Sequence, residues 1–195
     1  MDRATVILFA RAPRLGTVKS RLARGIGARA ALRFHCATFA ATARPIARDR
    51  RWRTVLATTP RGARADWARF VPRGTKRIHQ PHGDLGARMA GCMRPWSRAV
   101  LAGSDIPDLR PADIAAAIRA LGRADAVFGP ATDGGYWLVG LGPRRPARPF
   151  AGVRWSSEHA LSDTMANFRG RRVALLRCLQ DVDTAEDLAQ MRVRS

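Results

Sequence analysis

The chain has 195 residues and a formal net charge of +20, with 35 Lys and Arg against 15 Asp and Glu. Its 46% of hydrophobic residues excludes an intrinsically disordered chain, and no segment approaches the roughly 20 apolar residues of a membrane span. The length predicts one domain over residues 1–195. Three widely spaced cysteines and the lack of a signal-peptide pattern predict a cytoplasmic protein.

Short apolar runs alternate with helical patterns along the chain. Strands are expected at 5–9, 54–58, 77–80, 99–102, 125–128, 136–139 and 172–176. Helices are expected at 20–48, ended or kinked by Pro45, and at 84–93, 111–121, 157–168 and 184–191. This alternation predicts an α/β fold with a mostly parallel sheet flanked by helices. The Arg- and Pro-rich stretch 142–149 is expected to be an exposed loop.

The basic charge is unevenly distributed. Residues 1–82 hold 19 basic and 3 acidic residues, and residues 83–195 hold 16 basic and 12 acidic residues. Because Lys19 and Lys76 are the only lysines, most of this charge is arginine and can be compositional background. The charge alone would also suit a nucleic-acid-binding protein, which stays as a remote alternative.

The basic loop from Arg11 to Lys19 follows the first predicted strand. Ligands of α/β sheets bind beyond the carboxyl ends of strands, where Gly16 would let backbone amides approach a phosphate. Lys19 and Arg21 would neutralise phosphate charge. The loop is not a Walker A motif, since no glycine directly precedes Lys19. The alternative interpretation is a solvated basic loop.

Acidic residues gather where a cation could be held. Asp105 follows Ser104 at the carboxyl end of strand 99–102, which suits a divalent metal bound to a diphosphate. Asp181 and Asp183 are two residues apart, so both carboxylates face one side of an extended segment. The alternative for this pair is an Arg-paired surface cluster. Asp187 stands three residues after a threonine, the spacing of a capping box, which indicates a structural role.

Glycines mark two further stretches. Gly83 and Asp84 open the helix at 84–93, whose Gly86 would cost about 1 kcal/mol relative to Ala. That cost indicates close backbone approach to a ligand or to a neighbouring element.

The second stretch surrounds Asp133, Gly134 and Gly135, between two predicted strands. It can be a plain hairpin turn, or it can offer amides and a carboxylate to an acceptor molecule. Trp155 and Ser156 precede the helix at 157–168, where the serine can also be a simple N-cap.

These motifs, in this order, resemble the bacterial DUF2064 family of GT-A-fold transferases, often labelled as rSAM/selenodomain-associated or arsenosugar-biosynthesis glycosyltransferases. The matching segments are FARAPRLGTVKSRLA, GDLGARM, GSDIPDL, FGPATDGGYWLVGL, WSSEHALSDT and DVDTAEDL, which together span residues 9–188. The sequence is also similar to 2-phospholactate guanylyltransferases. One departure is Ala185, where proline is commoner in the family.

The resemblance implies a GT-A fold (the Rossmann-like fold of nucleotide-diphospho-sugar transferases), a nucleotide donor and Mg²⁺ or Mn²⁺. The implied metal ligands are Asp105, Asp181 and Asp183. The candidate catalytic residues are Lys19, Asp105 and Asp133, the last as a general base for glycosyl transfer. The resemblance implies phosphate contacts from Lys19 and Arg21, and an acceptor pocket lined by Gly134, Gly135, Trp155 and Ser156. The further candidate binding residues, taken from the motifs themselves, are Arg11, Gly16, Gly83, Asp84 and Ser104.

Two reactions remain open at this point. In glycosyl transfer, which the family label favours, an acceptor hydroxyl attacks the sugar of an NDP-sugar. In nucleotidyl transfer, a phosphorylated or acidic acceptor attacks the α-phosphate of an NTP and pyrophosphate leaves, which requires no base. Both reactions predict small-molecule partners, no membrane span and no nucleic acid.

Overall fold

The computed structural model describes residues 3–104 and 106–193. One seven-stranded sheet has the order β3-β2-β1-β4-β6-β5-β7. Its strands are β1 (Thr5–Arg11), β2 (Arg53–Thr59), β3 (Lys76–His79), β4 (Ala99–Gly103), β5 (Ala126–Pro130), β6 (Tyr136–Leu141) and β7 (Val173–Leu175). β6 is antiparallel to β4 and β5, and the other neighbouring pairs are parallel. The predicted α/β fold with a mostly parallel sheet is confirmed.

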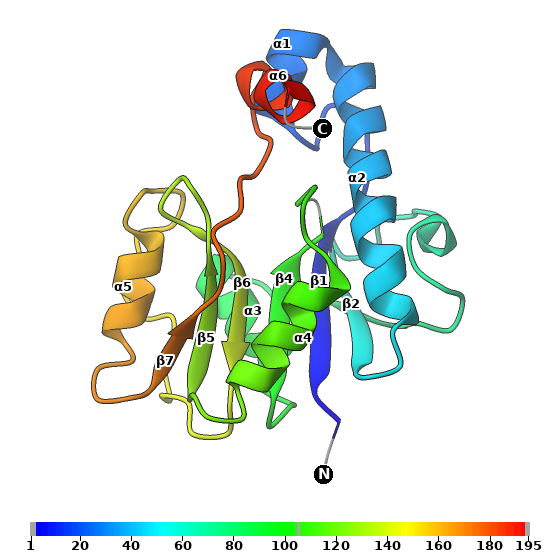
Figure 1. Ribbon diagram of the computed structural model, residues 1–195. Helices are drawn as coiled ribbons and strands as arrows, with labels where there is room; N and C mark the ends of the chain where they lie inside the picture. Colours follow the sequence, from blue (N-terminus) through cyan, green and yellow to red (C-terminus); the bar gives the residue numbers. More distant parts are fainter. Residues whose placement is uncertain (1–2, 105, 194–195) are drawn as a thin grey trace.

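Helices cover both faces of this sheet (Figure 1). They are α1 (Ser20–Ile26), α2 (Ala28–Arg48), the 3-10 turn η1 (Trp67–Arg69), α3 (Leu85–Met93), α4 (Pro111–Ala120), α5 (Ala160–Ala166) and α6 (Ala185–Val193). One core layer joins the sheet to α2 and α4, and a second joins its other face to α3 and α5. Within the described residues, none of these helices is long and apolar enough to cross a membrane.

The central strand β1 is buried on both faces, which explains its unbroken apolar run. Val6 and Leu8 point into the layer beneath α2 and α4, whereas Ile7 points into the layer beneath α3 and α5. This alternation has the period of two that a pleated strand imposes. The polar residues that follow β1 are thereby delivered to the carboxyl edge of the sheet.

The predicted helix at 20–48 is in fact two helices that meet at Gly27. This glycine has φ of 84°, a left-handed value that interrupts a helix of L-residues. Pro45 does not end α2, since the helix continues to Arg48. Ile46 and Ala43 are fully buried, so packing of this last turn compensates for the hydrogen bond that proline cannot make.

A small cap lies above the carboxyl ends of the parallel strands (Figure 1). It consists of α1, α6 and the first turns of α2, and its own apolar cluster contains Leu22, Ala31, Val182 and Leu188. The cap thus joins the residues that follow β1 to the end of the chain. The extended segment between β7 and α6, residues 176–184, carries Asp181 and Asp183 up to it.

Arg177 anchors this segment to the loop after β4. Its Nε donates to Asp113 Oδ1 at 2.7 Å, and its Nη2 donates to the Asp108 carbonyl oxygen at 2.8 Å. Asp113 also accepts the Arg110 amide at the start of α4. Burial alone would raise the pKa of Asp113, but the hydrogen bonds from Arg177 and the Arg110 amide hold it below its ordinary 3.8.

The stretch 142–149 is a loop, as expected, and residues 143, 144, 147 and 148 are exposed, but one side chain holds it to the body of the protein. Arg145 donates to the carbonyl oxygens of Gly142 at 3.0 Å, Met93 at 3.2 Å and Ser97 at 2.8 Å. The Arg145 side chain therefore ties this loop to the end of α3.

We expect Gly25→Ala to destabilise the cap. Helix propensity alone would favour alanine, but a Cβ at Gly25 would lie 2.6 Å from the Ala185 Cβ, between α1 and α6. Overpacking of this kind should lower the free energy of unfolding by about 1–2 kcal/mol in urea titrations. The double variant Gly25→Ala/Ala185→Gly should recover most of the loss, and a single variant as stable as wild type would contradict the contact.

We expect Asp113→Asn to lower the melting temperature at pH 7, at a cost of about 1 kcal/mol, because Arg177 is half exposed. A carboxyl group whose pKa is lower in the folded state than in the unfolded state stabilises the fold at pH values above its unfolded pKa. This stabilisation is lost as the pH falls through its folded pKa. The difference in melting temperature between wild type and variant should therefore become smaller below a pH of about 4.

Melting curves from pH 3 to 7 test this expectation. Asp66→Asn is the control, since Asp66 is exposed and forms no ion pair with another described residue. A gap of the same size at pH 3 and pH 7 would show that the ion pair of Asp113 contributes nothing.

Candidate functional site

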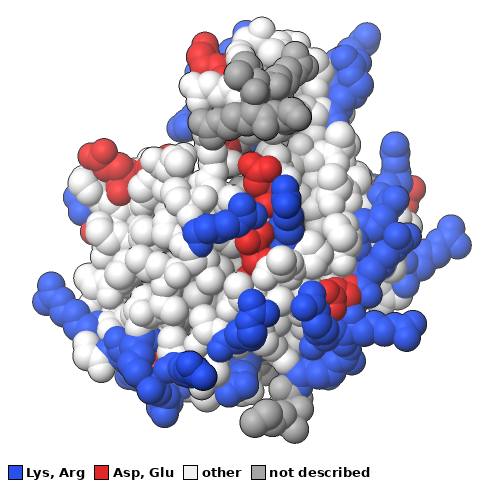
Figure 2. Space-filling view, viewed as in Figure 1, with Lys and Arg blue, Asp and Glu red and all other residues white. Residues whose placement is uncertain are grey.

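A cleft of about 730 Å³ opens at the carboxyl edge of the sheet, beside the cap. Its walls combine three kinds of side chain. Cationic residues are Arg11, Arg21 and Arg88, acidic residues are Asp133, Glu158, Asp181 and Asp183, and aromatic residues are Phe9, Tyr136, Trp137 and Trp155. Ser104 and Ser156 also line it. Figure 2 shows basic side chains widely spread elsewhere on one face of the molecule, so positive charge by itself does not mark the cleft.

A smaller hollow of about 250 Å³ adjoins the cleft under the cap. It is lined by residues 17–21 together with Arg11, His35, Asp181 and Asp183. Lys19 lies in this hollow, whereas Arg21 and the two aspartates line both spaces. The loop after β1 and the segment before α6 therefore form one wall.

The backbone of the loop after β1 is specialised at two positions. Gly16 has φ of 74°, and the turn there is closed by the Thr17 amide and hydroxyl, which donate to the Arg14 carbonyl oxygen. Lys19 has φ of 48° and ψ of 49°, a left-handed conformation uncommon for a residue with a side chain. It immediately precedes α1, and this conformation directs the lysine into the hollow.

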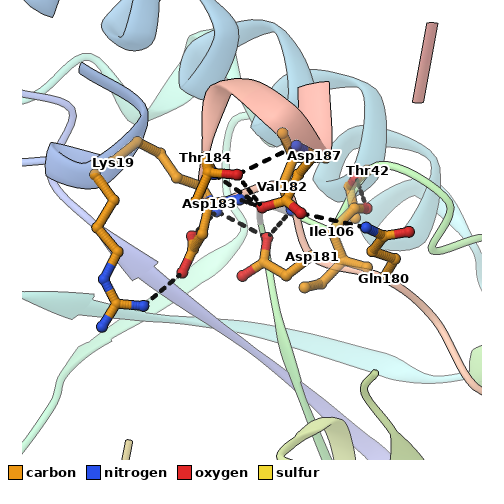
Figure 3. A network of polar contacts seen from close by, with 10 residues as sticks. Lys19, Thr42, Ile106, Gln180, Asp181, Val182, Asp183, Thr184 and Asp187 are labelled. Atoms are coloured by element: carbon orange, nitrogen blue, oxygen red, sulfur yellow. Dashed lines mark hydrogen bonds and ion pairs between the residues drawn. The ribbon is translucent and has the colours of Figure 1, made fainter. Parts of the chain in front are cut away.

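Lys19 forms two ion pairs with the segment before α6 (Figure 3). Its Nζ lies 2.8 Å from Asp181 Oδ1 and 3.0 Å from Asp183 Oδ1, and the lysine side chain is only 5% exposed. Arg21 Nη1 is 3.9 Å from Asp183 Oδ2, and its side chain is 68% exposed. Lys19 is therefore the inner cation of this wall and Arg21 the outer one.

Asp187 holds the segment of the two aspartates in shape, as Figure 3 shows at the start of α6. Its Oδ2 accepts the amides of Asp183 at 3.0 Å and Thr184 at 2.9 Å, and its own amide donates to Thr184 Oγ1 at 3.2 Å. Burial alone would raise the pKa of Asp187, but the backbone hydrogen bonds hold it below its ordinary value. The predicted capping box is confirmed.

The hairpin between β5 and β6 forms the opposite wall. Asp133 Oδ1 accepts the Gly135 amide at 2.9 Å, which closes the turn. Gly134 has φ of 81°, and a Cβ there would lie 2.2 Å from the Glu158 carbonyl oxygen. Its own carbonyl accepts the Leu161 amide at 3.0 Å. Gly134 is thus required for the close contact between this turn and the segment before α5.

Aromatic rings extend this wall towards α3. Tyr136 and Trp155 have ring centroids 6.4 Å apart, and the Tyr136 hydroxyl oxygen accepts from Thr164 Oγ1 at 3.3 Å. Burial raises the pKa of Tyr136, so its hydroxyl stays protonated. Ser156, next to Trp155, has φ of 61°. The wall therefore presents a rigid apolar surface beside a strained serine.

Gly86 explains the glycine pattern at the start of α3. A Cβ at this position would lie 2.8 Å from Trp155 Cζ2 and 2.9 Å from Phe150 Cβ. The close approach expected from the sequence is therefore to a neighbouring element of the protein. Asp84 caps α3 by accepting the Ala87 amide at 2.7 Å, and Gly83 precedes it with φ of 115°.

Arg88 is a cleft residue that the sequence patterns did not single out. Its guanidinium donates to Gln80 Oε1, while Gln80 Nε2 donates to the Ala57 carbonyl oxygen at 2.8 Å. Burial lowers the pKa of Arg88, and the nearby charge of Arg11 lowers it further. Its place in the motif GDLGARM was a signal, but one arginine among many does not stand out in this chain.

The expected metal ligand Asp105 lies outside the described residues. Ser104, just before it, is buried and donates to the Phe9 carbonyl oxygen at 2.7 Å, which joins the ends of β4 and β1. In residues 3–104 and 106–193, no group of three or more His, Cys, Asp or Glu side chains is arranged to hold a metal ion. The described part of the expected set is the Asp181 and Asp183 pair.

Comparison with known structures places this cleft in a known fold. A crystal structure from Desulfovibrio desulfuricans G20, described as a "putative nucleotide-diphospho-sugar transferase", is 29% identical, with a TM-score of 0.88 over 98% of this chain and 87% of that one. The 4-diphosphocytidyl-2C-methyl-D-erythritol synthase from Anaerococcus prevotii is 9% identical, with a TM-score of 0.61 over 100% and 99%.

A third structure, 2-C-methyl-D-erythritol 4-phosphate cytidylyltransferase from Thermus thermophilus, is 17% identical, with a TM-score of 0.50 over 100% of both chains. At these identities the last two show a shared fold. No curated protein matches the chain.

A protein-family model also matches residues 42–157, more than half of the chain, and its description is "Uncharacterized protein conserved in bacteria (DUF2064)". The match covers the sheet from β2 to β6 and the turn beside the cleft. The chain belongs to the DUF2064 family and has the fold of the nucleotide-diphospho-sugar transferases.

Proposed function

We propose that the chain is a metal-dependent transferase that uses a nucleotide donor and carries a glycosyl group from an NDP-sugar to a small acceptor. The observation that carries this proposal is the composition of one cleft. Cations and paired carboxylates form the wall under the cap, and a turn with aromatic rings forms the opposite wall. The description of the Desulfovibrio desulfuricans structure supports the same class of donor.

The wall under the cap suits the phosphates of the donor. Lys19 and Arg21 bring two cations to one side of the adjoining hollow, where they can stabilise negative charge on a departing diphosphate. Arg11 and Arg88 add positive charge along the cleft. We assign the phosphate contacts to Lys19 and Arg21.

Asp181 and Asp183 fit a divalent cation by the chemistry of their donor set. Their Oδ1 atoms already converge on one positively charged group, and Mg²⁺ is commonly held by one or two carboxylates together with substrate phosphates. A bound Mg²⁺ or Mn²⁺ would neutralise charge on the diphosphate. Asp105 stays in the proposed ligand set because of its place in the sequence motif.

The opposite wall suits the acceptor. Gly134 and Gly135 keep the turn narrow, while Trp155 and Ser156 line the space beside it. Asp133 is the proposed general base for an acceptor hydroxyl, since it lines the cleft on this side. The conformation of the loops around the donor is set by four further residues, Gly16, Gly83, Asp84 and Ser104.

Nucleotidyl transfer is the second candidate, and one observation favours it. Asp133 Oδ1 is engaged by the Gly135 amide, so this carboxylate already has a structural task in the turn. Attack by a phosphate or carboxylate on the α-phosphate of an NTP needs no base. In that reaction Lys19 and Arg21 would act on the pyrophosphate that leaves.

A donor screen separates the two reactions. We expect the melting temperature to rise with Mn²⁺ and either NDP-sugars or NTPs, and the donor class that gives the larger rise identifies the reaction. Asp183→Asn should remove the Mn²⁺-dependent part of this rise, because it removes one of two converging carboxylates. Asp163→Asn is the matched control, since Asp163 pairs with Arg154 and lines neither space.

If neither donor class changes the melting temperature with Mn²⁺ present, the proposed function is wrong. Affinity for RNA that falls steeply with salt and is unchanged in Asp183→Asn would favour the nucleic-acid alternative instead.

A further inference from the structure

The Lys19 ammonium lies between two carboxylates whose segment is itself held by backbone hydrogen bonds. Asp181 Oδ1 accepts the Val182 amide at 2.7 Å, and the amide of Asp183 is fixed by Asp187. Neither of these backbone contacts involves Lys19 (Figure 3). The Asp181 carboxylate and the Asp183 backbone therefore have supports that do not depend on the lysine.

We propose that Lys19 is an exchangeable internal cation, which competes with the divalent metal for Asp181 and Asp183 and which metal binding turns towards the donor phosphates. This inference rests on the proposed function. It adds that the divalent metal and the donor phosphates depend on each other for binding, and that the metal releases Lys19 for the phosphates. The metal and the phosphate bind cooperatively, because the metal displaces the Lys19 ammonium and the phosphate binds to this displaced ammonium.

Distances make the two cations mutually exclusive at this place. The ammonium is 2.8 and 3.0 Å from the two Oδ1 atoms, whereas Mg²⁺ requires oxygen ligands at about 2.0–2.1 Å. A dication held by both Oδ1 atoms would lie within contact distance of the ammonium, and two cations this close repel each other. The ammonium must therefore withdraw when the metal enters.

Lysine is suited to this exchange. Its charge is a compact point on a flexible four-carbon stem, so the ammonium can swing between partners without moving the backbone. Arg21 is not suited, because its guanidinium is 3.9 Å from Asp183 Oδ2 and its side chain is mostly exposed. Removing Arg21 from Asp183 would cost little, whereas moving the buried Lys19 ammonium away from Asp181 and Asp183 gives up two close contacts to carboxylates.

Phosphate oxygens can replace the two carboxylate contacts that the ammonium gives up. Lys19 and Arg21 line the same hollow, so a phosphate bound by Arg21 would lie near the released ammonium. By linkage, if the metal raises the affinity for phosphate, phosphate raises the affinity for the metal by the same factor. Each ligand alone should bind more weakly than in the presence of the other.

The experiment uses the wild-type chain, because Lys19 and Lys76 are its only lysines. Both amines are acylated with a small N-hydroxysuccinimide ester, and peptide mass spectrometry gives the ratio of the Lys19 rate to the Lys76 rate. Lys76 is exposed, lies over the Trp96 ring and does not line the cleft, so it serves as the internal reference. The arms are no addition, Mn²⁺ alone, and Mn²⁺ with inorganic pyrophosphate.

We expect slow acylation of Lys19 without additions, because its side chain is buried and paired. Mn²⁺ alone should raise the ratio by about tenfold or more, the change that corresponds to about 1.4 kcal/mol. Pyrophosphate added with Mn²⁺ should return the ratio towards its starting value. In Asp181→Asn/Asp183→Asn the ratio should be high from the start and should not respond to Mn²⁺.

Glu158→Gln is the matched control, since Glu158 lines the cleft with its Oε1 3.6 Å from His159 Nε2, and it should keep the Mn²⁺ response. A ratio that stays constant or falls with Mn²⁺ alone overturns the exchange, whether or not Mn²⁺ and nucleotide bind together. A chain that binds no nucleotide with Mn²⁺ while Mn²⁺ alone still raises the ratio would refute the proposed function and leave the exchange standing.

Discussion

The ion pairs of Lys19 with Asp181 and Asp183 join the loop after β1 to the segment before α6. The paired residues are 162 and 164 positions apart in the sequence. A buried charge costs several kcal/mol unless it is paired, so the buried Lys19 ammonium of the loop after β1 requires the carboxylates of the segment before α6. The apolar cluster of the cap closes around this contact. The apolar cluster and these ion pairs together hold the loop after β1 against the segment before α6, where they form the wall of the cleft.

The two walls of the cleft differ because the strands that lead to them run in opposite directions. The parallel strands β1 and β4 end at the cleft and deliver a cationic loop and Ser104. β6 runs the other way, so it begins at the same edge, and its first residue Tyr136 lies beside the turn that contains Asp133. The reversal of one strand therefore sets an aromatic wall opposite a charged one.

The sheet could be predicted from the sequence because buried strands leave an apolar run that is hard to mistake. The glycines at 25 and 27 indicated a loop or an interruption of a helix, but the helix at 20–48 was not divided there, because the residues on both sides favour helix. The left-handed backbone at Gly27 decides the break. Among site residues, Lys19 stood out as a rare lysine, and its carboxylate partners stood out by spacing. The sequence could not show whether Asp84 contacts a ligand or only caps α3, since aspartate is suited to both roles. Arg88 was missed because its partly buried position in the cleft depends on a contact with Gln80, which follows β3.

The most direct test is a crystal structure of the chain with Mn²⁺ and a nucleoside diphosphate. We expect the diphosphate within hydrogen-bond distance of Lys19 and Arg21, the metal on Asp181 and Asp183, and Lys19 no longer between the two carboxylates. A diphosphate bound outside the cleft, or a Lys19 still paired with both aspartates beside a bound metal, would contradict this arrangement.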